Sequence, residues 1–254
     1  ELVGQALATD GSLSAKGSTE HFQAHGDVSL GPPGQPAHLA VDLDGTPASI
    51  ALRTLALKQK KGQLVASGTV DLQPSLGWQL DMQAQHFDPG ELVAGWPGAI
   101  DADLRTRGRR QASGWEATLV LGRLGGKLRQ RTLGGHGELH LSPAGVLDGT
   151  LDLASGNSRL HVEGKPGAQN DAELRLAIAS LSDWLPDASG RLQGHLVVRG
   201  LTPRLSVNGT LQGDRLGWRQ DRLDHLQLVV GLPDLSRLAG KLDVQGQGLL
   251  ANGL

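Results

Sequence analysis

The sequence predicts an all-β fold, an elongated, curled and repetitive β-sheet (a β-taco) with a hydrophobic groove and few or no helices. Apolar and polar side chains alternate along short segments throughout the 254 residues. A period of two is typical of a strand with one apolar and one polar face. The 37 glycines separate or interrupt these segments, as residues of turns and bulges do. We find no window of about a dozen residues with the apolar spacing of an amphipathic helix.

The first strands are predicted from alternating segments between residues 12 and 84, including HLAVDLDG (38–45) and WQLDMQA (78–84). The segment SIALRTLAL (49–57) differs, because Ile50 and Leu52 fall on one parity and Leu55 and Leu57 on the other. A change of parity inside one run predicts a bulge or a tight corner. Further strands follow at WEATLVL (115–121), SRLHVEG (158–164) and AELRLAIAS (172–180), and at several segments beyond residue 200.

A linker followed by a strand occurs twice. FDPGELVAGWPGAIDADLRTRG (87–108) and LSDWLPDASGRLQGHLVVRG (181–200) share this form, with Gly98 and Gly190 separated by 92 residues. Each linker has room for one helical turn, and we expect its tryptophan, Trp96 or Trp184, to cover the sheet where the chain turns. The repeat divides the chain into segments 1–86, 87–180 and 181–254, which we expect to form one continuous elongated unit.

The composition argues against several functional classes. Only 3% of residues are aromatic, and there is no cysteine, which excludes disulfides and thiolate zinc sites. The net charge of −2 gives no reason to expect binding of nucleic acid. HGELH (136–140) places three possible metal ligands on one face of a strand, but a solvated polar face explains the pattern better. With no nucleophile elbow or phosphate-binding motif present, we expect neither an enzyme nor a cofactor or bound metal.

The aliphatic face of such a sheet must be buried by something, and a long sheet relieves its accumulated twist by curling. The interior can be a closed core or an open trough. Few aromatic residues would leave the interior underfilled, which favours a trough that accepts lipid acyl chains. The candidate lipid-binding residues are aliphatic side chains of one parity: Leu80, Ile100, Leu104, Leu119, Leu174, Leu176, Ile178, Leu192, Leu196, Val198, Leu226, Leu228 and Val230.

The two linker–strand phrases, and the RLQGHLVVRGLTPRLSVNGTLQG that completes the second, resemble the repeated phrases of the TamB family of AsmA-like proteins. This resemblance implies a periplasm-spanning β-taco whose groove carries phospholipid between the inner and outer membranes. It also implies an inner-membrane anchor, the outer-membrane barrel TamA as a partner, and roles in autotransporter and outer-membrane-protein assembly. Because the chain starts at Glu1 and ends within a strand-like pattern, we expect a piece of a longer protein.

Other functions remain open from the sequence. A β-solenoid adhesin or passenger, or a chaperone-like scaffold for outer-membrane protein assembly, would show similar alternation. A β-helix polysaccharide enzyme would need a cluster of carboxylates on an exposed face, and Asp101 with Asp103 is a weak signal for one.

Overall fold

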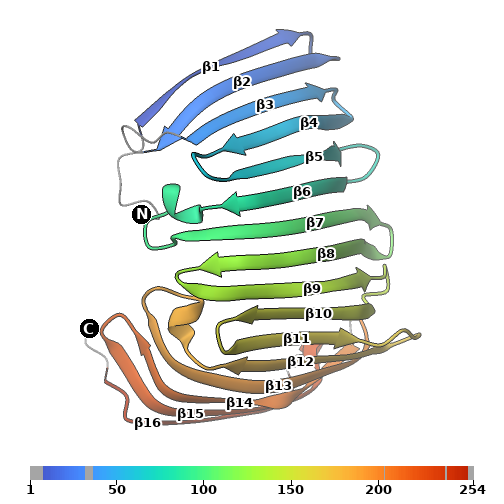
Figure 1. Cartoon of the computed structure of the whole chain (residues 1–254). Helices are drawn as coiled ribbons and strands as arrows, with labels where there is room; N and C mark the ends of the chain where they lie inside the picture. The colour runs from blue at the N-terminus through green and yellow to red at the C-terminus, as the bar shows by residue number, and fades with distance from the viewer. Residues whose placement is uncertain (1–7, 32–36, 203, 238, 251–254) are drawn as a thin grey trace. The chain divides into compact units, whose positions relative to one another are not determined.

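The computed structural model describes residues 8–31, 37–202, 204–237 and 239–250. In this part of the chain, strands follow one another with short connections (Figure 1). The strands are β1 (Ala8–Gly17), β2 (Phe22–Gly31), β3 (Ala37–Gly45), β4 (Ser49–Lys58), β5 (Gln63–Asp71), β6 (Gly77–Phe87), β7 (Gly98–Gln111), β8 (Gly114–Leu128), β9 (Arg131–Leu141), β10 (Leu147–Ser155), β11 (Ser158–Gly164), β12 (Asn170–Ile178), β13 (Ala188–Leu201), β14 (Arg204–Trp218), β15 (Asp221–Asp234) and β16 (Ala239–Gln247).

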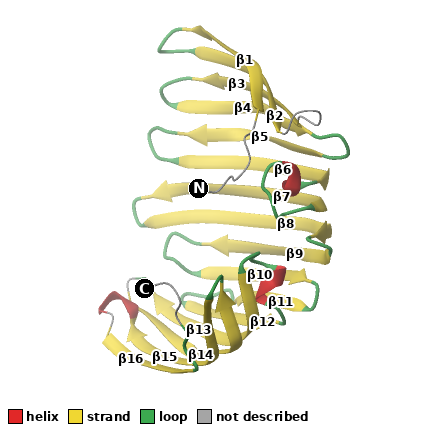
Figure 2. Ribbon diagram, turned by 90° about the vertical axis from the view of Figure 1, so that its left-hand side faces the viewer, coloured by secondary structure: helices red, strands yellow, loops and turns green. Residues whose placement is uncertain are grey.

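The strands form one antiparallel sheet in which each strand is hydrogen-bonded to the next in the sequence, with β1 and β16 at the two ends of the order. Helical structure in the described residues is limited to three-residue 3-10 turns, η1 (Pro89–Glu91), η2 (Leu181–Asp183) and η3 (Leu235–Arg237). Figure 2 shows these turns in red against the strands. The predicted all-β class, with a repetitive, curled sheet and few or no helices, is confirmed.

The chain divides into two compact units, Glu1–His136 and Gly137–Leu254, with the boundary inside β9. In the first unit β2 to β8 form successive hairpins. In the second unit β10 to β12 are short, whereas β13 to β15 are long and strongly bent (Figure 1). These two units do not test the division into segments 1–86, 87–180 and 181–254, which stays a prediction.

The parity change in SIALRTLAL is a bulge in β4. Asp42 of β3 pairs with Thr54, and the next residue of β3, Leu43, pairs with Leu52, so Arg53 is extra. One added residue shifts the alternation by one position. Ile50 and Leu52 therefore lie on the same face of the sheet as Leu55 and Leu57, although their sequence parity differs.

The linker–strand repeat has a structural counterpart. Both linkers contain a 3-10 turn, with η2 starting 92 residues after η1, and both lead into a 14-residue strand, β7 or β13, followed by a 15-residue strand, β8 or β14. Each linker also makes the same backbone contact with the next turn of the sheet. The N–H of Arg129 donates to the carbonyl of Pro97 (2.6 Å), and that of Arg219 to the carbonyl of Asp187 (2.9 Å).

Candidate functional site

The aliphatic face of the first unit follows from the register of its strands. Residues directly opposite each other on neighbouring strands lie on the same face. Leu80 of β6 pairs with Thr106 of β7, which pairs with Leu119 of β8. Two residues along, Leu104 extends a parallel row from Met82. The fourth predicted residue, Ile100, pairs with Phe87 beyond a bulge in β6 and stays on this face.

The second unit repeats this arrangement with more of the predicted residues. Three rows cross its strands: Leu174–Leu196–Gly209–Val230, Leu176–Gly194–Leu211–Leu228 and Ile178–Leu192–Gly213–Leu226. Val198 continues β13 on the same face, opposite Ala172 and Val207. The register therefore brings the nine predicted residues of this unit onto one face of β12, β13 and β15.

The predicted residues are not packed as the core of a globular domain is. Of the thirteen, Ile178 is buried, with 6% of its surface exposed, and the other twelve are half-buried. Large apolar side chains of a closed core are usually fully buried. Within each unit, the aliphatic face is thus shielded by neighbouring side chains rather than covered by a second layer.

Glycines on this face make room for the side chains of neighbouring leucines. In the second unit Gly194, Gly209 and Gly213 stand opposite leucine or valine in every row described above. A Cβ placed on Gly194 would lie 2.7 Å from Cδ1 of Leu211, and one on Gly213 would lie 2.6 Å from Cδ1 of Leu216. Leucine side chains therefore occupy the space above Gly194 and Gly213. Interior glycines also permit the strong bending of these strands.

The linker of the second unit lies on the aliphatic side of the sheet. Ser158 is two residues before Leu160 in β11, so its side chain shares the face of Leu160. Its hydroxyl donates to Oδ2 of Asp183 in η2 (3.2 Å) and accepts from the backbone N–H of Ala179 (3.1 Å). Ser158 is fully buried and Asp183 is 4% exposed. This contact anchors η2 over the end of the β10–β11 hairpin.

Burial around this linker agrees with a local cover. Ile178 and Ala188, the aliphatic-face residues on either side of the linker, are each 6% exposed. Trp184 is half-buried, and its Nε1 is buried with no hydrogen-bond partner among the described residues. The cover by Trp184 stays a prediction.

The linker of the first unit docks at the equivalent hairpin, β4–β5. The Gln59 side chain bonds both backbone groups of Asp88, with Nε2 donating to the carbonyl (2.7 Å) and Oε1 accepting from the N–H (2.8 Å). The Asp88 carboxylate accepts from the N–H of Gly90 and of Gly98 (2.9 and 2.7 Å). Trp96 is half-buried, with the Arg129 guanidinium 5.8 Å from its ring centroid, within cation–π range.

A tryptophan pair on the aliphatic face was not anticipated from the sequence. Trp78 and Trp115 stack with centroids 5.7 Å apart at 47°, and Trp78 Nε1 donates to Thr106 Oγ1 (3.1 Å). The Trp78 ring lies over Gly108, whose Cβ position is 2.5 Å from it. A clue existed in WQLDMQA, where Trp78 shares the parity of Leu80, but its partner is on another hairpin.

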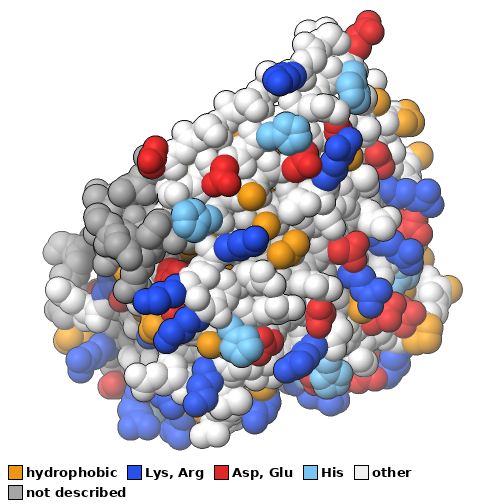
Figure 3. Space-filling model, turned by 45° about the horizontal axis from the view of Figure 1, so that its top comes forward, with side chains coloured by type: hydrophobic (Ala, Val, Ile, Leu, Met, Phe, Trp, Pro, Cys, Tyr) orange, Lys and Arg blue, Asp and Glu red, His pale blue; other side chains and the backbone are white. Residues whose placement is uncertain are grey.

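The opposite face of the sheet is polar and mixed in sign. Figure 3 shows acidic, basic and histidine side chains interspersed on the surface in view. Several histidines stand beside carboxylates of a neighbouring strand, as in His161 with Asp152 (2.7 Å) and His225 with Asp214 (3.1 Å). The Lys165 ammonium and the Arg199 guanidinium, both hydrogen-bonded to Asp171, hold the pKa of that carboxyl below its usual value.

Among the described residues, no three His, Asp or Glu side chains are grouped as a metal site requires. His136, Glu138 and His140 of HGELH are not such a group. Nor does any helix in the described part of the chain have the length and apolar character needed to cross a bilayer.

Comparison with known proteins gives the family. No solved structure matches the chain. The family model described as "TamB, N-terminal domain" matches residues 2–254, nearly the whole sequence, which agrees with the resemblance of the linker–strand phrases. The chain belongs to the TamB N-terminal domain family.

Proposed function

We propose that this chain forms part of a periplasmic hydrophobic groove that conducts phospholipid acyl chains between the inner and outer membranes. In this way it supports outer-membrane biogenesis without catalysing a reaction. One observation carries the proposal: leucine, isoleucine and valine side chains from successive strands share one face in each unit and are mostly half-buried. Family membership supports a role in the bacterial envelope.

The energetics favour such a surface. Burying one methylene group is worth about 0.8 kcal/mol, so a 16-carbon tail costs roughly 12 kcal/mol to expose to water. A face lined by similar aliphatic side chains lowers this cost at many successive positions. Because these contacts are non-directional, a tail can move from one row of side chains to the next without breaking specific hydrogen bonds.

Other components would hold the groove at the two membranes. An inner-membrane anchor elsewhere in the intact protein would hold the groove at the inner membrane. The outer-membrane barrel TamA would receive the other end. The polar face, with its mixed charges, would remain in periplasmic water.

The test is a double substitution, Leu176→Arg with Leu196→Arg, in the intact protein. It places two charges on the aliphatic face of neighbouring strands, and we expect delivery of phospholipid to the outer membrane to fall severely. The matched control is Ala177→Arg with Gln193→Arg, because these two residues are cross-strand partners on the polar face of the same strands and both are exposed. Undisturbed delivery by a folded Leu176→Arg, Leu196→Arg variant would refute the groove.

Native mass spectrometry separates this proposal from its alternatives. A groove that carries lipid should retain phospholipid during purification, and the double arginine variant should not. A β-solenoid adhesin would be lipid-free in both forms. A chaperone-like scaffold for outer-membrane proteins would also purify without lipid, while its variant would lose client assembly.

A further inference from the structure

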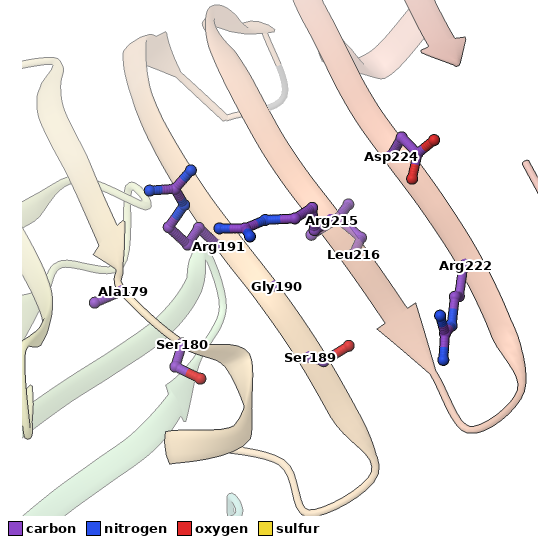
Figure 4. Close-up of a pocket in the computed structure, with 9 residues that line it drawn as sticks. All are labelled: Ala179, Ser180, Ser189, Gly190, Arg191, Arg215, Leu216, Arg222 and Asp224. Carbon is purple, nitrogen blue, oxygen red and sulfur yellow. The ribbon is translucent and has the colours of Figure 1, made fainter. Parts of the chain in front are cut away.

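A depression of about 500 Å³ lies within the second unit, between the ends of β12 and β15. Its lining includes three arginines, Arg191 of β13, Arg215 of β14 and Arg222 of β15, against one acidic residue, Asp224. Figure 4 shows the Arg215 side chain extending across β13 toward Arg191. All three arginines are exposed, so the positive charge is accessible to a ligand.

The depression lies at the bulge between β13 and β14, and Arg191 lines it from the polar face. Arg191 is adjacent to Leu192 in β13 and pairs with Asp214 rather than with an aliphatic residue. Ser189 pairs with Gly217, which pairs with Arg222. Because Gly217 has no side chain, the Ser189 hydroxyl occupies the space above it, between β13 and β15.

Most of the arginine donors are uncommitted. The shortest contact of Arg191 with Asp214 is 3.6 Å, longer than the 2.7–2.9 Å of a charge-assisted hydrogen bond. The side chains of Arg215 and Arg222 have no ion-pair or hydrogen-bond partner among the described residues. A guanidinium group presents five N–H donors in a planar fork, which matches the oxygens of a phosphate group.

The backbone aims one of these arginines. Arg215 has φ 49° and lies at a bulge opposite Gly190, which has φ 99°. Positive φ is unfavourable for arginine, and bulges change the direction of a side chain relative to the regular alternation. Here that change directs Arg215 toward Arg191 (Figure 4).

The fold itself does not require these charges. In the first copy of the repeat, the residue 92 positions before Arg191 is Ala99. The second residue after the Arg129-Gln130 turn, at the place of Arg222 after the Arg219-Gln220 turn, is Thr132. Arg215 corresponds to Arg123 in the shared RLG sequence, but Arg123 pairs with Asp103 in the register. The cluster of accessible arginines is a feature of the second copy.

We infer that this depression, the arginine site, binds a phosphate group, either of a phospholipid headgroup or of a soluble phosphate compound. Arg191 and Arg215 would bind the phosphate oxygens, with Arg222 adding positive charge and Ser189 a hydroxyl donor. The inference does not depend on acyl-chain transport, because the arginines and Ser189 would contact only the phosphate group.

The experiment is isothermal titration calorimetry of the purified chain with inorganic phosphate, glycerol 1-phosphate and dihexanoyl phosphatidylglycerol below its micelle concentration. We expect saturable binding that weakens by about tenfold for each charge-assisted bond lost in the Arg191→Gln, Arg215→Gln double variant. The Arg105→Gln, Arg107→Gln variant is the matched control, since both residues are exposed arginines of β7. Circular dichroism verifies that each variant is folded, and single variants replace the double one if it is not.

The outcomes separate the two sources of phosphate. Equal binding of all three probes identifies the phosphate group alone as the ligand, and preference for the lipid identifies a headgroup. Binding of the lipid that is lost in the Leu176→Arg, Leu196→Arg variant but kept in the Arg191→Gln, Arg215→Gln variant supports the groove and overturns the arginine site. Absence of binding by any probe, or binding equal in wild type and the arginine double variant, also overturns it.

Discussion

The hydroxyl of Ser158 donates a hydrogen bond to the carboxylate of Asp183 across 3.2 Å, with both residues buried. The two residues are 25 positions apart and join the β10–β11 hairpin to the linker before β13. Because a buried carboxylate is costly without hydrogen bonds, this contact fixes where the linker lies on the aliphatic face. The Gln59–Asp88 contacts do the same for the other linker.

Substituting Ser158→Ala is expected to lower the free energy of unfolding by about 2 kcal/mol, because it removes a donor to Asp183 and the acceptor for the Ala179 N–H in a buried site. Urea denaturation measures the change. Ser113→Ala, at an exposed turn, should stay within about 0.5 kcal/mol of wild type. A loss equally small for Ser158→Ala would show that the linker is held by other contacts.

Deletion of Arg53 is expected to be tolerated, with a loss of about 1–2 kcal/mol, because it removes the ion pair with Asp44, whose carboxylate is half-buried. Removing the extra residue of the bulge leaves Ile50, Leu52, Leu55 and Leu57 in regular alternation on one face. Deletion of Ala56 is the contrasting change, because it makes Leu55 and Leu57 adjacent and forces one onto the polar face.

The loss for the Ala56 deletion should reach about 1.5–3 kcal/mol, the value of burying one leucine, in addition to any change of register. Chemical denaturation of the two deletion variants gives the comparison. If the Arg53 deletion proved the more damaging of the two, the assignment of Arg53 as the bulge residue would be wrong.

Glycines of the aliphatic face should differ in their tolerance of alanine. A Cβ on Gly209 would fall on the carbonyl oxygen of His195 and 2.8 Å from Cα of Leu196, which are backbone atoms. At Gly194 the nearest atom is the end of the flexible Leu211 side chain, at 2.7 Å. We expect Gly209→Ala to cost about 1–3 kcal/mol through overpacking, and Gly194→Ala clearly less, in paired thermal melts. Equal costs would contradict this steric account.

The pKa of Asp171 predicts a pH dependence of stability. Hydrogen bonds from Lys165 and then Arg199 lower this pKa in the folded protein, so the unfolded chain binds a proton at a higher pH than the folded one. The stabilising contribution is therefore complete above the ordinary aspartate pKa of about 4 and is lost as pH falls through the lower folded-state value. Asp171→Asn should be less stable than wild type at pH 7, and the difference should shrink at pH 3.

Glu91 provides a control of opposite sign. Burial, and then the nearby charge of Asp88, raises its pKa, which means that the ionised form is disfavoured in the folded state. Glu91→Gln should therefore gain stability relative to wild type at pH 7, and the gain should disappear at pH 3. Urea titrations at both pH values test the pair. A gain at pH 3 equal to that at pH 7 would exclude an effect of charge.

Much of this architecture could be read from local patterns. Alternation predicted the shared face of Leu174, Leu176 and Ile178, and the parity change around Arg53 predicted a bulge. The boundaries of long strands were less accessible. The alternation of WEATLVL ends at Leu121, but β8 continues to Leu128, because the register shift near Gly122 restores the pairing of Leu124 with Ala102.

The sequence by itself determined the fold class, the family phrases and the side-chain composition of each face, because a strand's alternation depends only on neighbouring residues. The tertiary structure decided which distant residues come together: Trp78 stands against Trp115, Ser158 bonds Asp183, and Arg191 and Arg215 line one depression. It also decided how far the leucines are exposed. These properties depend on strand register and on the bending of the sheet, which are set by contacts between residues far apart in the chain.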